Sequence, residues 1–504
     1  MLFNSGTFIF FFLPFVFLLF LMVRRFGRSI TIGLLVLSSL FFYAWTEPSW
    51  VLILIVSIFA NFLMARLIRQ THSKMLVGLT VVGNLAVLGY YKYTNFFIDT
   101  AAPLFGATPI PLEIVLPIGI SFFTFQQIAY VVDSLKDRTH GHDFLSYCLF
   151  VSFFPQLIAG PIVHHEDVIP QTKGKQGLRP TGLDIQIGIT LFVFGLFKKL
   201  VLADNIAIFA TPVFDAAAGG YAPTFFEAWG AALAYTFQIY FDFSGYSDMA
   251  IGLARMFGIR LPENFNAPYK ATNIAEFWQR WHMTLSRFLR DYLYIPLGGN
   301  RQGVARTFSN LMTVMILGGL WHGAGWGFVV WGGLHGAYLC IHRLWSGQLT
   351  PWLGRILTFL AVVVAWVFFR AETLEAALAI SAGLIGQNGI VIDAAWAKDI
   401  GWFGDVLLGL GASFDGDRAL LFMGWAQIKW FALLLWIVWF GPTTQDMMAN
   451  YDPVLKITRL PPNKAPISLF VWSPSAQWAL VTFVLFVLSI PHVFAPRPFL
   501  YFQF

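Results

Sequence analysis

Long runs of apolar residues, separated by short polar loops, dominate the 504-residue chain. Many of these runs reach the roughly 20 residues that a helix needs to cross the hydrocarbon of a bilayer. A transmembrane barrel would instead show short segments of alternating character. The pattern predicts an all-α polytopic membrane protein of about eleven to thirteen transmembrane helices.

Positively charged residues in the first loops give the predicted helices an orientation. One basic group lies at residues 24–28, after the first apolar run, and a second lies at residues 66–74, after the third. Since Lys and Arg gather in cytoplasmic loops, the N-terminus is expected to face the outer side of the membrane. The first run has no basic region before it and no small-residue cleavage site after it, so we expect no cleavable signal.

Two predicted spans are interrupted at membrane depth. One passes through Pro117 and Gly119 and is expected to be a bent helix from about Ile114 to Asp133. The next closes at residues 153–161, which hold two prolines and a glycine, and is expected to be broken or re-entrant. Such backbone is tolerated in a bilayer only where protein buries it or water reaches it.

Residues 255–306 differ from the rest because they hold an excess of arginine, which places them at the cytoplasmic face. Within them, residues 276–292 repeat apolar side chains at helical spacing, opposite a charged face, and predict one amphipathic helix that stops at Pro296. Such a helix can lie in the membrane interface or pack into the bundle from below. His282 lies beside its apolar stripe.

Charged residues beside apolar runs elsewhere are interpreted as structural. Lys198 and Lys199 are expected to end one span, and Asp248 is expected to cap a following helix. Asp242 and Asp248 would be costly unless hydrogen-bonded, which favours a structural role over catalysis. The His-His-Glu-Asp run at residues 164–167 is interpreted as a solvated loop, because adjacent ligands without further spaced partners are weak evidence for a metal. No metal site is predicted.

The composition supports a membrane protein and argues against other classes. Hydrophobic residues make up 57% of the chain and charged residues only 12%, against about 25% charged residues in soluble domains. The net charge of +6 is not gathered on a basic face with exposed aromatic residues, so no nucleic-acid partner is expected. We expect one multi-pass domain over residues 1–504, with its core at about residues 110–370 and an acidic, outward-facing insertion at about residues 388–420.

Two histidines lie in settings that indicate chemistry. His322 follows Trp321 in an apolar run, and the glycines at 323, 325 and 327 would let a ligand chain approach the backbone. Because imidazole titrates near neutral pH, His322 and His282 are candidates for a base and for a group that orients donor or acceptor in one tunnel. The alternative is that each is a packed histidine bonded to a backbone carbonyl. His335 and His342 are interpreted as structural.

Longer motifs resemble the membrane-bound O-acyltransferase (MBOAT) family. The stretch that begins Glu276-Phe277-Trp278-Gln279-Arg280-Trp281-His282 and ends Pro296-Leu297-Gly298-Gly299-Asn300 is similar to that family, as is Leu320-Trp321-His322-Gly323. The chain is most similar to the alginate O-acetyltransferase membrane subunits and related polysaccharide-acetylating proteins. That similarity rests on residues 154–161, residues 241–250, Asn264-Phe265-Asn266-Ala267-Pro268-Tyr269 and the ending Phe499-Leu500-Tyr501-Phe502-Gln503-Phe504.

The resemblance implies a helical fold with a central funnel crossed by a tunnel, with His322 as the catalytic histidine and His282 as the second histidine of this bacterial branch. It implies acetyl-CoA as the cytoplasmic acyl donor and no permanently bound cofactor. It further implies a multi-pass protein of the bacterial inner membrane, with a periplasmic N-terminus. Periplasmic acetyltransferase partners would then modify an exopolysaccharide such as alginate.

Three alternatives remain open from the sequence. A close variant would transfer D-alanine or another acyl group from a carrier protein to a cell-wall polymer. A transporter would also need broken helices and buried polar groups, but it predicts internal repeats and paired ionisable residues, which the sequence does not show. A purely structural scaffold of an export complex would leave His322 and its glycines without a purpose.

Overall fold

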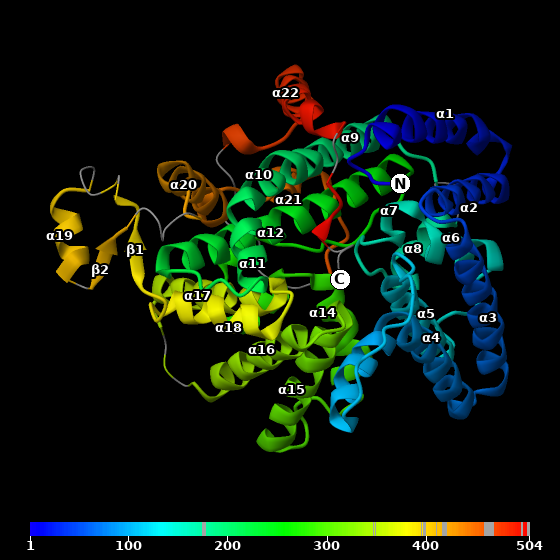
Figure 1. Cartoon of the computed structure of the whole chain (residues 1–504). Coiled ribbons are helices and arrows are strands. Elements are labelled where there is room, and N and C mark those ends of the chain that lie inside the picture. The colour runs from blue at the N-terminus through cyan, green and yellow to red at the C-terminus, as the bar shows by residue number, and fades with distance from the viewer. Residues whose placement is uncertain are drawn as a thin grey trace.

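Helices make up most of the described chain (Figure 1). The structure is a computed structural model that describes residues 1–173, 178–345, 347, 349–394, 396, 400–409, 411–415, 421–457, 468–494 and 497–500. The longer helices are α1 (Leu13–Val23), α2 (Arg28–Ala44), α3 (Ser49–Thr71), α4 (Lys74–Ala101), α5 (Ile120–Ser134), α9 (Gly182–Phe197), α12 (Phe225–Met256), α15 (Gly303–His322), α16 (Trp326–Leu344), α17 (Pro351–Arg370), α18 (Leu374–Leu384), α20 (Gly424–Phe440) and α22 (Ala476–Val493).

Short helices and two strands connect these elements. The short helices are α6 (Phe144–Ser152), α7 (Phe154–Leu157), α8 (His165–Val168), α10 (Asp204–Ile206), α11 (Thr211–Ala218), α13 (Ile274–Arg280), α14 (Met283–Leu289), α19 (Trp402–Gly409) and α21 (Thr444–Met447). Strands β1 (Ile390–Ile392) and β2 (Ala412–Phe414) pair in parallel, with Ile390 opposite Ala412. In Figure 1 these strands and α19 form a small lobe at one edge of the bundle. Four charged residues of the predicted acidic insertion lie outside the described residues: Lys398, Asp399, Asp417 and Arg418.

Six helical segments of the described chain are long and apolar enough to cross a membrane: Phe8–Phe26, Ser49–Thr71, Lys74–Phe105, Gly182–Phe209, Pro351–Arg370 and Ala476–Val493. Three shorter apolar helices are α2, α18 and α20. The all-α polytopic fold is therefore confirmed, whereas the count of eleven to thirteen spans stays a prediction. The long helix α12 is not among the six segments, and it holds four charged residues: Glu227, Asp242, Asp248 and Arg255.

Helix α12 runs through the middle of the bundle against α9 (Figure 1). Two glycine pairs set their separation: Gly188 faces Gly252, and Gly195 faces Gly245. A Cβ added to any of the four would lie too close to the partner's backbone oxygen. Small residues let membrane helices approach closely enough for backbones to touch. The two backbones therefore pack directly, and the charged residues of α12 are enclosed by neighbouring chain.

Three expectations about charged residues were wrong. Asp248 does not cap a helix, because α12 continues through it from Phe225 to Met256. Lys198 and Lys199 do not end the span, because the chain stays helical beyond α9, and Lys199 is buried. His164 and His165 are buried rather than in a solvated loop, and the His165 Nε2 lies 3.2 Å from the Asp133 carboxylate. In each case, packing against neighbouring elements determines where the residue lies. The local sequence pattern does not contain that information.

Two expectations about helix boundaries also need correction. The bent helix expected from about Ile114 begins only at Ile120, because Gly119 adopts a left-handed backbone conformation before it. The single amphipathic helix expected at residues 276–292 is instead α13 and α14, which are separated at Trp281 and His282. Residues 153–161 are broken as expected, with α6 ending at Ser152 and the four-residue α7 after it. Their side chains are buried in protein.

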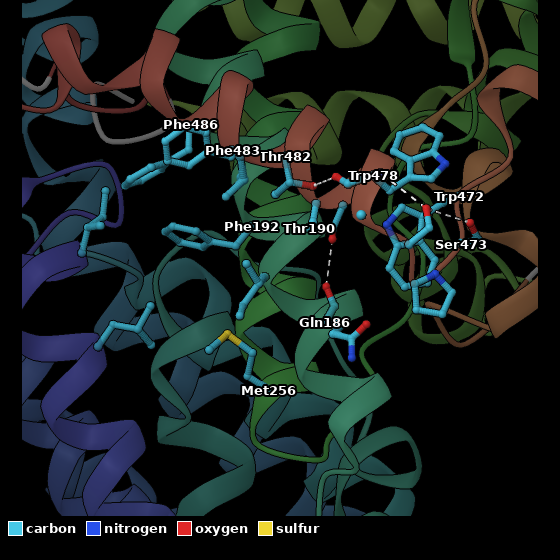
Figure 2. A pocket seen from close by; sticks show the side chains of 18 residues that line it. Gln186, Thr190, Phe192, Met256, Trp472, Ser473, Trp478, Thr482, Phe483 and Phe486 are labelled. Atoms are coloured by element: carbon cyan, nitrogen blue, oxygen red, sulfur yellow. Dashed lines mark hydrogen bonds between the residues drawn. The ribbon is translucent and has the colours of Figure 1, made fainter.

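An apolar groove of about 630 Å³ lies between α9 and α22 (Figure 2). Phe192, Phe483 and Phe486 line one part of it, and Trp472 and Trp478 line another. Its lining residues include no titratable side chain. The groove therefore offers no group for acid–base chemistry, and the candidate site lies elsewhere.

Candidate functional site

His322 is the last residue of α15, immediately before the link to α16. Its side chain is 4% exposed and lies among three aromatic rings. The ring centroids of Trp321, Trp331 and Phe369 are 5.0, 5.2 and 5.3 Å from that of the imidazole. These rings shield the imidazole from solvent, which is the environment in which a thioester would be protected from water.

The glycines around His322 serve helix packing. A Cβ on Gly319 would collide with the Phe328 carbonyl oxygen, and a Cβ on Gly323 would collide with the Phe328 ring. A Cβ on Gly327 would lie 2.5 Å from the Phe368 oxygen. The space beside these residues is thus filled by the protein's own α16 and α17. The expectation that the glycines leave room for a ligand chain was wrong for Gly323 and Gly327.

His282 occupies the break between α13 and α14 and is fully buried. Its φ of 42° is left-handed, a conformation that non-glycine residues rarely adopt and that costs about 1–2 kcal/mol. Backbone bonds from the Asn264 segment hold the break: the Asn266 N–H donates to the Arg280 oxygen, and the Met283 N–H donates to the Asn264 oxygen. The break is therefore fixed from outside the two helices.

The Asn264 side chain orients the imidazole of His282. Its Oδ1 lies 3.1 Å from His282 Nδ1 and also accepts the Thr284 hydroxyl at 2.9 Å. The Thr284 backbone N–H, which can only donate, points at the same oxygen. Since Oδ1 can only accept, His282 Nδ1 carries the hydrogen and Nε2 is the basic nitrogen of the neutral ring. The Asn264 amide in turn donates to the Ser247 hydroxyl of α12 at 3.1 Å.

The two sequence-predicted histidines lie side by side. Their ring centroids are 6.3 Å apart, although 40 positions separate them in the chain. The His282 ring also lies against Phe243 of α12, with centroids 4.7 Å apart. Two imidazoles thus share one buried, aromatic compartment whose wall comes from α12, α15, α16 and α17. The tunnel expected to reach this compartment stays a prediction.

His335, interpreted as structural, lies close to this compartment on α16. Its Nδ1 accepts the indole N–H of Trp278 at 3.2 Å, and its ring centroid is 4.8 Å from that of Trp331. Trp331 separates it from His322. His342 is exposed at the end of α16. The interpretation of both as structural stays a prediction.

Sequence reasoning missed two contributors to the compartment. Asn264 was part of a recognised motif but had no assigned role, because its partner His282 lies 18 positions away. Lys92 directly follows the apolar run at residues 75–91, and its ammonium donates to the carbonyls of Trp321 and His322. The sequence did offer one indication for Lys92. An ionisable residue next to an apolar run is a functional candidate by default.

Two carboxylates of α12, Asp242 and Asp248, are buried against lysines, and their interpretation as structural stays a prediction. Asp242 accepts from the Lys199 ammonium at 2.6 Å, and Asp248 accepts from Lys198 at 2.6 Å. Lys199 also donates to Asp204 at 2.8 Å and to the Pro498 carbonyl at 3.2 Å. Within the part of the chain that the structure describes, no group of three or more His, Cys, Asp or Glu could hold a metal ion.

Comparison with known proteins agrees with this geometry. The sequence profile of the membrane-bound O-acyltransferase family matches residues 112–370, which include both histidines. The peptidoglycan O-acetyltransferase of Helicobacter pylori is 44% identical over 429 residues, covering 77% of this chain and 81% of that protein. The probable alginate O-acetylase AlgI of Pseudomonas putida is 38% identical over 522 residues, covering 100% of both chains.

A more distant relative acts on a different acyl group. The teichoic acid D-alanyltransferase of Streptococcus thermophilus is 28% identical over 284 residues, covering 50% of this chain and 68% of that protein. The family match, the full-length similarity and the all-helical membrane fold agree with one another. The chain belongs to the membrane-bound O-acyltransferase (MBOAT) family and is a membrane-embedded acyltransferase.

Proposed function

We propose that this O-acetyltransferase takes acetyl from acetyl-CoA at the cytoplasmic face and passes it across the inner membrane for O-acetylation of an exopolysaccharide such as alginate. The observation that carries the proposal is the buried pair of imidazoles, 6.3 Å apart, in a family whose reaction is acyl transfer to oxygen. The O-acetylating relatives are more similar to the chain than the D-alanylating one, which supports acetyl as the group transferred.

The reaction needs one base near a thioester. His322 accepts the proton of the acceptor hydroxyl while the hydroxyl oxygen forms a bond to the acetyl carbon. The carbon–sulfur bond then breaks, and the imidazolium returns the proton to the thiolate, which leaves as free CoA. His282, held by Asn264, orients the donor or acceptor beside it. The atoms and charges of this step balance, because the proton lost by the alcohol ends on sulfur.

The depth of the histidines supports transfer through the membrane. Helix α15 has 20 residues, and its first turns hold Arg306, close to the basic stretch expected at the cytoplasmic face. At 1.5 Å per residue, His322 lies about 30 Å from the start of the helix. We propose that the two histidines lie between the cytoplasmic face expected for residues 255–306 and the outer side, where a periplasmic acetyltransferase partner would receive the acetyl group.

Purified protein in lipid nanodiscs with labelled acetyl-CoA tests the proposal. We expect CoA release and acetyl transfer by the wild type, a loss of at least about 100-fold in His322→Ala, and unchanged turnover in His342→Ala, whose imidazole is exposed. Full activity of folded His322→Ala would refute the catalytic role. Turnover with an acyl-carrier protein and none with acetyl-CoA would show that acetyl-CoA is not the donor.

The similarity to the peptidoglycan O-acetyltransferase favours a second acceptor, peptidoglycan. The two acceptors are distinguished in cells by deleting the gene and measuring O-acetyl groups separately in the secreted polysaccharide and in purified cell walls. Loss of acetyl only from the cell wall would overturn the exopolysaccharide assignment and leave the acyl transfer itself in place.

A further inference from the structure

Helix α4 packs loosely against the rest of the protein. Over its 28 residues, only Leu88 is buried, and the others are exposed or half-buried. Its second half nevertheless meets the end of α15. The Phe96 ring lies 5.7 Å from that of Trp326, the first residue of α16. Besides its bonds to α3 through Asn84 and to Leu112 through Asn95, this helix makes polar contacts with the segment that holds His322.

Three hydrogen bonds join the two helices. The Lys92 ammonium donates to the carbonyl oxygens of Trp321 and His322, at 2.7 and 2.9 Å. The Tyr93 hydroxyl donates to the carbonyl oxygen of Leu320 at 2.7 Å. The last carbonyls of a helix have no partner within it, and in hydrocarbon no water is present to supply one. Helix α4 thus satisfies the final three carbonyls of α15.

These carbonyls could accept hydrogen bonds without a lysine. Neutral hydroxyl or amide donors can bond a carbonyl, whereas an ammonium group is expensive to place within a bilayer. A positive charge at the C-terminal end of a helix gains from the helix dipole, and one ammonium can hold two successive carbonyls. The second of these belongs to the residue whose side chain is the proposed base, so the contact fixes the backbone from which the imidazole extends.

We propose that Lys92 is a positioning residue: its ammonium holds the C-terminal carbonyls of α15 and thereby keeps the His322 imidazole against His282. The inference rests on the proposed function of His322. The rings around His322 come from its neighbour Trp321 and from α16 and α17. The direction of the imidazole therefore still depends on where α15 ends. The Lys92 bonds set that end.

The test compares Lys92→Met, Lys92→Arg and wild type in nanodiscs, with whichever acyl donor the wild type turns over. We expect kcat of Lys92→Met to fall by about 100-fold, because misplacing a catalytic group by about 1 Å has an effect of this size. KM for the donor should change by less than about 3-fold, since Lys92 does not reach into the donor's path in the proposal. Lys92→Arg should restore kcat to within about 10-fold of wild type.

Lys270→Met is the matched control. Lys270 also donates to the carbonyl at a helix end, that of Gly441 after α20 at 2.6 Å, so its bond is made at α20 and not at α15. It should leave kcat unchanged. If Lys92→Met fails to fold, Tyr93→Phe, which removes only the neighbouring bond to Leu320, should still lower kcat several-fold. A kcat for folded Lys92→Met within 3-fold of wild type overturns the inference, as does an equal loss in Lys270→Met.

A readout without turnover separates this inference from the proposed function. In protein labelled with ¹⁵N-histidine, the ring nitrogens of His322, assigned by their loss in His322→Ala, should give one set of signals in wild type and Lys92→Arg. Lys92→Met should give broadened or multiple signals. Unchanged His322 signals in Lys92→Met would refute positioning even if no donor were found. Absence of turnover with ordered His322 signals would instead count against the proposed reaction.

Discussion

His282 shows how one residue can be strained and still well determined. It takes a left-handed backbone conformation that interrupts an otherwise continuous helical sequence, and its imidazole is bonded to Asn264. Thr284 links this network to the broken segment, because its hydroxyl oxygen accepts the Ile162 N–H at 2.9 Å. Strained conformations persist where the surroundings over-determine them, and they gather at functional sites. The backbone of His282 is thus a second indication, beside its position, that this residue has a function.

Removing the Asn264 side chain should disable His282 without removing it. We expect Asn264→Ala to lower kcat by roughly 10- to 100-fold, at the lower end of what a positioned acid–base group contributes, because His282 can then rotate or change tautomer. Asn61→Ala is the control: Asn61 is buried and bonded to Asn84, but belongs to α3 away from the histidines. Steady-state turnover in nanodiscs measures both. Equal activity of Asn264→Ala and wild type would reduce Asn264 to packing.

At the scale of elements, the α15–α16 hairpin determines where His322 points. Gly319 of α15 faces the Phe328 carbonyl, and Gly332 of α16 faces that of Met315. These contacts bring the two backbones together just below the link at residues 323–325. Hydropathy predicts the two helices. Their close contact depends on glycines, which have no side chain, and a hydrophobic pattern does not reveal it.

Adding one methyl group should separate the two helices at a predictable place. Gly332→Ala would press a Cβ against the Met315 carbonyl, so we expect a loss of about 1–3 kcal/mol in stability and a matching fall in the melting temperature. Gly333→Ala, next to it on the same helix, meets nothing within 4 Å and should be neutral or slightly stabilising. Thermal unfolding of the two detergent-solubilised variants gives the comparison. Equal melting temperatures would show that α16 can shift freely.

For the whole molecule, one buried cation joins distant parts of the chain. Lys199 follows α9 and contacts Asp242 of α12, Asp204 of α10 and the backbone of the C-terminal segment at Pro498. The Leu500 N–H donates to the other Asp242 oxygen at 3.2 Å. The final described residues are therefore held in the interior by the same charge pair that links α9 to α12. The remainder of the closing motif, from Tyr501 onward, lies outside the described residues.

The two partners of this pair should differ in importance. Lys199→Met leaves the buried Asp242 and the partly exposed Asp204 without this cation, whereas Asp242→Asn leaves Lys199 paired with Asp204. Removing one member of a buried pair costs about 3–5 kcal/mol, so we expect Lys199→Met to lower the melting temperature more than Asp242→Asn does. Lys198→Met, at a less buried site, is a useful reference. The reverse order would mean that Asp242 acts mainly through Leu500.

The sequence by itself determined the membrane class and the helical architecture, and it singled out both histidines as candidates. These depend on local information: hydropathy over about 20 residues marks a span, and a titratable ring in an apolar run is conspicuous wherever the chain folds. The resemblance to the MBOAT family, later confirmed, rests on the same kind of contiguous motif. The expected helix at residues 276–292 failed because its break is imposed by a segment from elsewhere in the chain.

Only the tertiary structure decided what surrounds the histidines. Asn264, His282 and His322 come from three segments, and Lys92 meets His322 across 230 positions of sequence. No periodicity predicts such a contact, because its position depends on how closely α12, α15 and α16 pack and not on the residues beside it. The structure likewise buries Lys199, and it buries His164 and His165, which were expected in a solvated loop. Their hydrogen-bond partners, and not their neighbours in sequence, offset the free-energy cost of that burial.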